Sequence, residues 1–185
     1  MNPKTDILAR FNEINVFAPG WKSCQNCIKI NEAAQINPAV SNERLTRLGE
    51  RIDFSRFGKY PKVYLGGGWS VPENWGVWSL DKKATITLPL PAVTPKKLVI
   101  DAQAFIGGTQ TSQLVDITIN GVPQAQVILN KRFGNQFEVP LNSSMMNAGR
   151  LKLELQFPTA ISPKALGIDI DERPLAIGLE AVRYE

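Results

Sequence analysis

The stretch Val-Asp-Ile-Thr-Ile-Asn-Gly, at Val115–Gly121, decides the fold. Its apolar and polar side chains alternate, and this places them on opposite faces of a β-strand with one face buried. The Asn-Gly pair at its end is a preferred two-residue connection of a β-hairpin, because both positions accept a positive φ. The sequence therefore predicts an antiparallel hairpin that turns at Asn120 and Gly121.

The same pattern recurs on both sides of this hairpin. Ala84–Leu88 and Leu151–Leu155 alternate as half-buried strands do. Gly, Pro and Asn separate these strands from further apolar or alternating runs, which are Arg51–Phe54, Lys62–Leu65, Leu98–Phe105, Gln126–Leu129, Gln136–Val139 and Ala176–Tyr184. Short strands at this spacing predict a mainly β fold over residues 49–185, an antiparallel β-sandwich of the jelly-roll, galactose-binding-like type.

Residues 1–48 have a different pattern. Apolar residues within Ile7–Phe17 recur at helical spacing until Pro19, and a second helical stretch covers Cys27–Gln35. Helices this short do not hold a core of their own. We therefore expect a short helical N-terminal extension, a cap or linker, in front of the sandwich.

Charge and hydropathy exclude several classes of partner. The chain has 185 residues and a net charge of +4, and its basic residues form no run longer than a pair. Nucleic-acid binding usually needs a concentrated basic stripe, so no nucleic acid is expected. No apolar run approaches the roughly 20 residues that span a bilayer, and no signal peptide follows Met1. Taken alone this indicates the cytoplasm, but a piece of a larger exported or membrane-anchored protein would show the same features.

The chain has two cysteines, Cys24 and Cys27, and no histidine. The missing histidine excludes Ser-His-Asp and Cys-His nucleophiles, and it leaves a zinc site without enough N or S ligands. We expect neither a metal nor a cofactor. A Cys-x-x-Cys pair of this kind is read as a local disulfide, which favours an oxidising compartment, with two free thiols as the alternative.

Three of the four tryptophans lie close together, at Trp69, Trp75 and Trp78. Successive side chains of a strand point to opposite faces. Trp69 and Trp75 stand at odd positions and Trp78 at an even one, so the three rings cannot all point the same way along a simple strand. An exposed indole beside the carboxylate of Glu73 suits a sugar, whose C–H bonds pack on the ring while its hydroxyls bond to the acid. The alternative is that the rings close one end of the sandwich core.

Three segments together resemble a known family. They are Gly49–Phe54 (GERIDF, followed by Tyr64-Leu65), Trp69–Ser79 (WSVPENWGVWS) and Leu166–Leu179 (LGIDIDERPLAIGL). Residues 48–185 resemble the jelly-roll module that lies C-terminal to the membrane region of bacterial multi-spanning glycosyltransferases, and a related module of membrane phosphoglycerol transferases that modify periplasmic glucans. Ala176 stands where that pattern often has glycine.

This resemblance implies a role in envelope glycan biology and a periplasmic location, with a tether to the inner membrane in the full-length protein. It also implies that the stretch up to Leu48 joins the module to a last transmembrane helix, in agreement with a disulfide between Cys24 and Cys27.

The acidic residues allow several interpretations. Glu73 either accepts sugar hydroxyls or pairs with Arg173 across the fold, since half-buried charges need partners. Glu73 with Asp171, or Asp81 with Asp169, would be needed as a carboxylate pair for glycoside hydrolysis. A small sandwich offers little room for such a cleft, so hydrolysis is disfavoured. Calcium binding by the acidic residues of 169–172 is disfavoured too, because their spacing matches no EF-hand.

The sequence thus predicts a non-catalytic, extracytoplasmic module that binds or positions a glycan for a membrane-bound transferase. The alternative is a structural or interaction module that docks on its parent enzyme or a partner and has no ligand of its own. The predicted ligand-binding residues are Trp69, Ser70, Glu73, Trp75, Trp78, Asp171 and Arg173.

Overall fold

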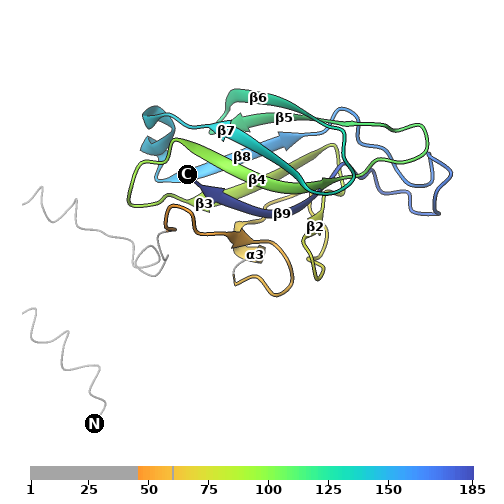
Figure 1. Cartoon of the computed structure of the whole chain (residues 1–185), viewed down its shortest axis with the longest axis horizontal. Helices are drawn as coiled ribbons and strands as arrows, with labels where there is room; N and C mark the ends of the chain where they lie inside the picture. The colour runs from red at the N-terminus through yellow and green to blue at the C-terminus, as the bar shows by residue number, and fades with distance from the viewer. Residues whose placement is uncertain (1–45, 60) are drawn as a thin grey trace, which may run out of the picture. The chain divides into compact units, whose positions relative to one another are not determined.

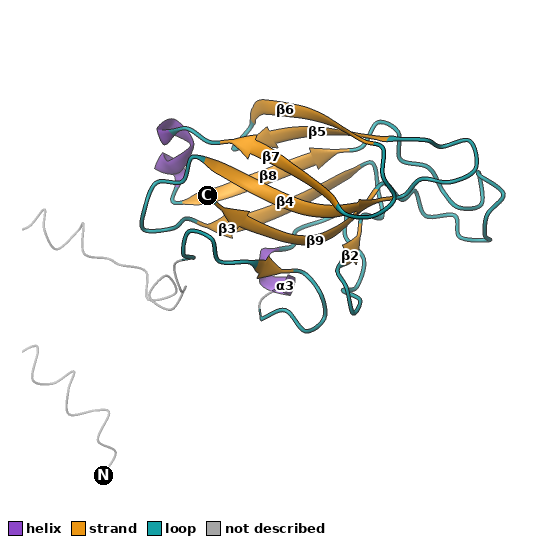
Figure 2. Ribbon diagram, in the orientation of Figure 1, coloured by secondary structure: helices purple, strands orange, loops and turns teal. Residues whose placement is uncertain are grey.

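Two antiparallel sheets packed face to face form the protein (Figures 1 and 2). The structure, a computed structural model, describes residues 46–59 and 61–185, without the side chains at positions 61 and 147. One sheet has the order β1-β9-β4-β7, in which the strands are Ile52–Asp53, Ile177–Tyr184, Lys97–Ala104 and Asn135–Pro140, and β2 (Val77–Trp78) also pairs with β9. The other has the order β3-β8-β5-β6, with strands Lys83–Pro89, Arg150–Gln156, Gln113–Ile119 and Val122–Leu129. The predicted antiparallel β-sandwich is confirmed.

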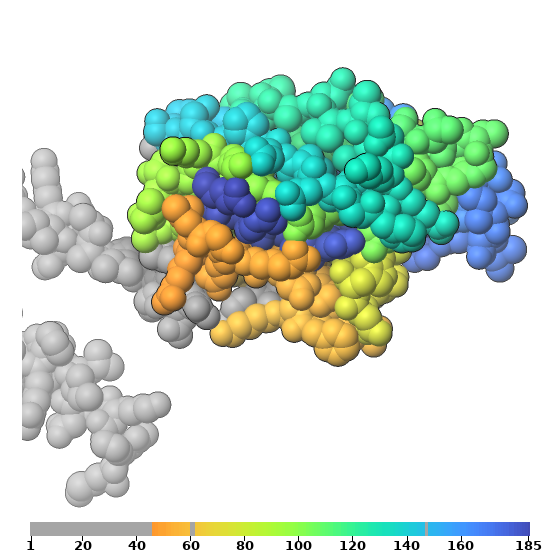
Figure 3. Space-filling model, in the orientation of Figure 1, coloured from red at the N-terminus to blue at the C-terminus, as the bar shows by residue number. Residues whose placement is uncertain are grey.

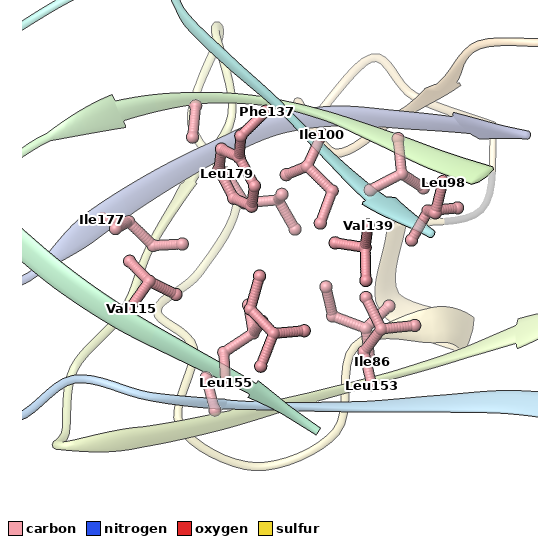
Figure 4. Packing of buried hydrophobic residues seen from close by; sticks show 14 of the residues in the cluster. Ile86, Leu98, Ile100, Val115, Phe137, Val139, Leu153, Leu155, Ile177 and Leu179 are labelled. Atoms are coloured by element: carbon pink, nitrogen blue, oxygen red, sulfur yellow. The ribbon is translucent and has the colours of Figure 1, made fainter. Parts of the chain in front are cut away.

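The core lies between the sheets and follows the alternation in the sequence. Buried and more exposed residues alternate along the whole of β5, β7 and β8. Figure 4 shows side chains of the two sheets meeting, with Val115, Leu153 and Leu155 on one side and Ile100, Val139, Phe137 and Leu179 on the other. Each fully buried aliphatic chain contributes about 1.5–3 kcal/mol to folding, so this layer is the main source of stability.

The Asn-Gly hairpin forms as predicted. Asn120 has φ 48° and Gly121 has φ 84°, which gives both turn residues the left-handed backbone that this connection needs. β6 starts directly after the turn, at Val122, whereas the alternation placed its start at Gln126. Pro123 hid the first part of the strand. It is tolerated there because β6 is an edge strand and the register shifts between Ile117 and Thr118, opposite the proline.

One predicted strand is wrong. Lys62–Leu65 was expected to be extended, but Pro61–Tyr64 forms a single helical turn, α3. Proline suits the first position of a helix, since its fixed φ is helical and its missing N–H would have no partner there. Only Leu65 keeps a strand-like contact, an isolated bridge to Ile86. A 3-10 helix, Ser143–Ala148, precedes β8.

Several expectations lie outside the described residues, namely the helical extension before position 46 and the Cys24–Cys27 pair. The described residues fall within one compact unit, Arg44–Glu185. Within residues 46–59 and 61–185, no helix is both long and apolar enough to cross a bilayer.

Candidate functional site

Residues 69–79 form a short hairpin, here called the tryptophan hairpin, whose second arm contains β2. The backbone N–H of Ser70 donates to the carbonyl of Trp78 at 2.8 Å, which joins the two arms. At the tip, the N–H of Glu73 donates to the carbonyl of Gly76 at 2.7 Å. Because β2 pairs with β9, the hairpin is fixed to the edge of a sheet (Figure 1). It is therefore a rigid element, as a binding site requires.

The hairpin places two of its tryptophans on opposite sides, as their parity predicted. Trp69 forms a bridge with Ser79, whose side chain is fully buried, so the indole of Trp69 packs against the core. Its Nε1–H donates to the carbonyl of Thr85 at 2.8 Å. Trp78 has the other parity and faces away from the core. The two predicted roles of the aromatic cluster, core closure and surface exposure, are thus divided between its members.

Trp75, Trp78 and Phe105 form a half-buried surface that we call the aromatic shelf. The ring centroids of Trp75 and Trp78 are 5.1 Å apart at an interplanar angle of 71°, and those of Trp78 and Phe105 are 6.3 Å apart at 89°. Gly178 of β9 forms the floor, since a Cβ at that position would lie 2.4 Å from Cη2 of Trp75. Edge-to-face contacts of this kind hold the rings in place while part of each ring stays in water.

Glu73 lies beside the shelf and is exposed. Its Oε2 accepts a hydrogen bond of 3.1 Å from Nε1–H of Trp75, which orients the indole. None of the residues that the structure describes donates to its other oxygen, Oε1. The carboxylate therefore offers an acceptor next to an aromatic ring, as expected from the sequence.

Arg173 has a different partner from the expected one. Its Nε–H and Nη2–H donate to the two oxygens of Asp171, at 2.9 and 2.6 Å, and within the described ranges it forms no ion pair with Glu73. The contact is local, because the backbone N–H of Arg173 also donates to Asp171, at 2.9 Å. Closing a loop of two residues costs far less entropy than joining positions 73 and 173.

Glu73 and Arg173 nevertheless interact through their charges. Hydrogen bonds from the Arg173 side chain and backbone lower the pKa of Asp171 to about 2. The pKa of Arg173 is raised, chiefly by that side-chain hydrogen bond and further by the negative charge of Glu73. The Asp171–Arg173 pair therefore lies within electrostatic range of Glu73.

Ser70 is used to hold the hairpin together. Its hydroxyl accepts from the backbone N–H of Trp78 at 3.2 Å and donates to the carbonyl of Val71 at 3.0 Å. The predicted site residues thus separate into three sets. Trp75 and Trp78 belong to the shelf, with Glu73 beside it. Trp69 and Ser70 anchor the hairpin, and Asp171 and Arg173 form a local ion pair on which the charge of Glu73 acts.

The other acidic candidates are engaged locally. Asp81 caps the backbone N–H of Lys82 at 2.6 Å, and Asp169 caps that of Ile170 at 2.5 Å. In the part of the chain that the structure describes, no three His, Cys, Asp or Glu side chains are placed to hold a metal ion.

A hollow that the sequence did not reveal adjoins the hairpin. It has a volume of about 550 Å³ and is lined by Arg56, Lys59, Lys62, Val63, Val71 and Pro72, together with Gly58. A smaller hollow of about 240 Å³ shares Lys62, Val71 and Pro72 with it and extends to Trp69 and Ser70. We call the two together the basic groove. In Figure 3 the segments on its two sides, orange and yellow, lie next to each other below the sandwich.

The sequence contains a pattern of basic residues at this groove, but the wrong prediction of a strand at Lys62–Leu65 obscured it. Arg56, Lys59 and Lys62 recur every third residue, yet the prediction of a strand at Lys62–Leu65 would have pointed neighbouring side chains in opposite directions. The helical turn α3 instead brings Lys62 and Val63 to the same hollow.

Comparisons with known proteins give a family and several structural likenesses. A family model described as a domain of unknown function (DUF7024) matches residues 39–185. No curated protein matches the chain. Among solved structures, the chain is similar to the acetyl xylan esterase Est2A from the rumen bacterium Butyrivibrio proteoclasticus, at 14% identity and a TM-score of 0.45 over 76% of this chain and 32% of the esterase.

Two carbohydrate-binding modules are similar over most of their own length. One is CBM36 in complex with calcium and xylotriose, at 11% identity and a TM-score of 0.42 over 74% of this chain and 99% of that module. The other is a family 35 module from an environmental isolate, at 12% identity and a TM-score of 0.35 over 77% and 89%. The chain spans about one third of the esterase. At 11–14% identity these likenesses carry no functional residue over to this chain.

Proposed function

The chain belongs to the family described as a domain of unknown function (DUF7024), and we propose that it binds a glycan on the aromatic shelf without catalysing a reaction. The observation that carries the proposal is the placement of Trp75. Its ring is half-buried on a glycine floor, oriented by Glu73 and braced by Trp78. A ring held in this way loses little rotamer entropy when a ligand covers it, which favours binding.

The polar groups beside the ring fit sugar hydroxyls. Oε1 of Glu73 is an acceptor, and the guanidinium of Arg173, with its side chain 57% exposed, supplies donors. Asp171 fixes the orientation of that guanidinium through three hydrogen bonds to its two oxygens. An aromatic ring with an acceptor beside it, and a cation within range of that acceptor's charge, fits a small-ligand site, in which a few polar groups orient the ligand. Affinities in the millimolar to micromolar range are expected from so few contacts.

The pKa of Asp171 argues against a role for this group as the general acid of a glycosidase. A glycosidase needs a carboxylic acid whose pKa is raised, so that it can protonate the leaving group. The pKa of Asp171 is moved in the opposite direction, to about 2, so this group stays ionised at neutral pH. Incubating the protein with the glycans that it binds, followed by analysis for cleavage products, tests this part of the proposal.

We place this activity outside the cytoplasm, in a protein whose remaining part is a membrane-bound glycosyl- or phosphoglycerol transferase. The support is the resemblance of residues 48–185 to the modules of such enzymes, described above. The half-burial of all three shelf rings also fits the alternative, in which the shelf docks on the parent enzyme and binds no sugar.

Calorimetric or NMR titration with a panel of envelope oligosaccharides distinguishes these two functions. The Trp75→Ala variant should bind at least about fivefold more weakly, because the packing of a sugar ring on one indole is worth about 1 kcal/mol or more. Phe133→Ala is the matched control, since Phe133 is an exposed aromatic residue (61%) outside the shelf. A wild-type protein that binds no glycan of a broad panel would leave only the docking function.

A further inference from the structure

The basic groove collects positive charge with no acid in its lining. Arg56, Lys59 and Lys62 surround the larger hollow, together with Val63, Val71 and Pro72. Cations gathered around one hollow repel one another, and an anion between them removes this repulsion.

Arg56 and Lys62 differ from the basic residues of the sandwich that form ion pairs. Six other basic residues form ion pairs with carboxylates, namely Arg51, Lys83, Lys97, Lys164, Arg173 and Arg183. Among residues 46–59 and 61–185, the side chains of Arg56 and Lys62 have no carboxylate partner. Their donors are therefore directed to the hollow or to water, where an anionic ligand reaches them.

The other end of the groove is aromatic. The smaller hollow shares Lys62, Val71 and Pro72 with the larger one, and Trp69 lines it. The groove also lies next to the tip of the tryptophan hairpin, because the backbone N–H of Arg56 donates to the carbonyl of Glu73 at 2.7 Å. A ligand in this groove would place an apolar face near an indole and a negative group near two or three cations.

We propose that the basic groove binds the anionic group, a carboxylate or a phosphate, of an acidic saccharide. This inference rests on the proposed glycan-binding function and names the class of glycan. A sugar ring would lie along Val71, Pro72 and Trp69, and its anionic substituent would accept hydrogen bonds from Arg56 and Lys62. Charge-assisted hydrogen bonds of this kind give both affinity and selection against neutral sugars.

The test compares two ligands of the same length and linkage. Cellotetraose is neutral, and the corresponding tetramer of glucuronic acid has a carboxylate on every ring. Titration calorimetry at low and at moderate salt should give at least about tenfold tighter binding of the uronic tetramer, and the preference should weaken with salt. Inorganic phosphate should compete with the uronic tetramer but not with cellotetraose.

Variants connect the preference to the groove. The double variant Arg56→Gln/Lys62→Gln should reduce the preference for the uronic tetramer to about twofold or less. Lys96→Gln/Lys131→Gln, which removes two exposed charges outside the groove, should leave the preference unchanged. Melting temperatures of both double variants should equal that of the wild type, since the four side chains are on the surface.

The outcomes separate the two proposals. Equal binding of both tetramers, unchanged in Arg56→Gln/Lys62→Gln, overturns the groove proposal and leaves glycan binding on the shelf in place. Binding of the uronic tetramer that survives Trp75→Ala but not Arg56→Gln/Lys62→Gln supports the groove and contradicts the shelf. Binding of neither tetramer, together with Arg56-dependent binding to phosphatidylglycerol vesicles, would overturn both and assign the groove to a lipid surface.

Discussion

Substitution of Gly178 by alanine tests whether the shelf is built as described. A Cβ at this position would lie 2.4 Å from Cη2 and 2.7 Å from Cζ3 of Trp75, and 3.3 Å from Cε3 of Trp78. Carbon atoms pack at about 3.5–4.0 Å, so the Trp75 ring must withdraw by about 1.1–1.6 Å. A movement of that size is enough to break the hydrogen bond of 3.1 Å that Nε1 donates to Glu73.

The cost to stability should be small. The Trp75 ring is half-buried and can swing toward water, so the loss lies at the lower end of the overpacking range, about 1 kcal/mol. Alanine loses less backbone entropy on folding than glycine does, which stabilises a strand by up to about 0.5–1 kcal/mol. This gain offsets part of the overpacking loss. Gly76→Ala should behave differently, because its Cβ would lie 2.3 Å from the backbone oxygen of Leu179, which cannot withdraw. We expect a loss of about 3 kcal/mol there.

Two measurements distinguish these effects. Urea denaturation gives the free energy of unfolding, and far-UV circular dichroism detects the exciton coupling of the two indoles whose ring centroids are 5.1 Å apart. Gly178→Ala should weaken both the exciton signal and glycan binding, while the free energy of unfolding falls by no more than about 1 kcal/mol. Gly67→Ala is the control, because nothing lies within 4 Å of its Cβ. An unchanged exciton signal in Gly178→Ala, or a loss of stability equal to that of Gly76→Ala, would refute the described contact.

Three further predictions concern the scaffold and the charged group. Ser79→Ala should cost about 1–3 kcal/mol in urea denaturation, because the buried hydroxyl accepts from two backbone N–H groups at the start of β9, both at 3.1 Å; a loss below 0.5 kcal/mol, on the scale expected of an exposed serine, would contradict this. Leu153→Ala should cost about 2–5 kcal/mol, since the side chain is fully buried between the sheets, and an intact melting curve would show that the core is described wrongly. Because Arg173 lowers the pKa of Asp171 from 3.8 to about 2, the contribution of Asp171 to stability is present above pH 3.8 and is lost as the pH falls toward 2. The difference in melting temperature between wild type and Asp171→Asn should therefore be seen at pH 6 and vanish below pH 2, and a difference that persists at the lower pH would argue against the pair.

Alternation in the sequence was enough to predict most of the sandwich. Val115–Ile119 and Leu151–Leu155 have one polar and one apolar face, and this leaves a single way to bury them. The prediction was wrong at Lys62–Leu65, where the effect of Pro61 on the backbone outweighed a short apolar pattern. It also missed β2, because two residues are too few to show a period.

The candidate site was only partly predictable for a similar reason. Odd and even positions separated Trp69 from Trp78 as the structure does, but they grouped Trp75 with Trp69, whereas the turn at Glu73–Gly76 brings Trp75 to Trp78. The partner of Arg173 was predicted wrongly, because a distant pair and a local pair are indistinguishable in composition and only the turn geometry favours Asp171. The basic groove is lined by Arg56 and by Val71, which belong to separate segments, and no local pattern encodes such an arrangement.

The proline in β6 affects whether two molecules of the protein can pair along their sheet edges. β6 is the outermost strand of its sheet, and its side chains Val122 and Ile128 are 56% and 65% exposed. A foreign strand adding there would find no amide proton at Pro123 and a distorted ladder beside it. Pro123 therefore disfavours edge-to-edge polymerisation along an edge strand whose exposed apolar side chains would otherwise favour it.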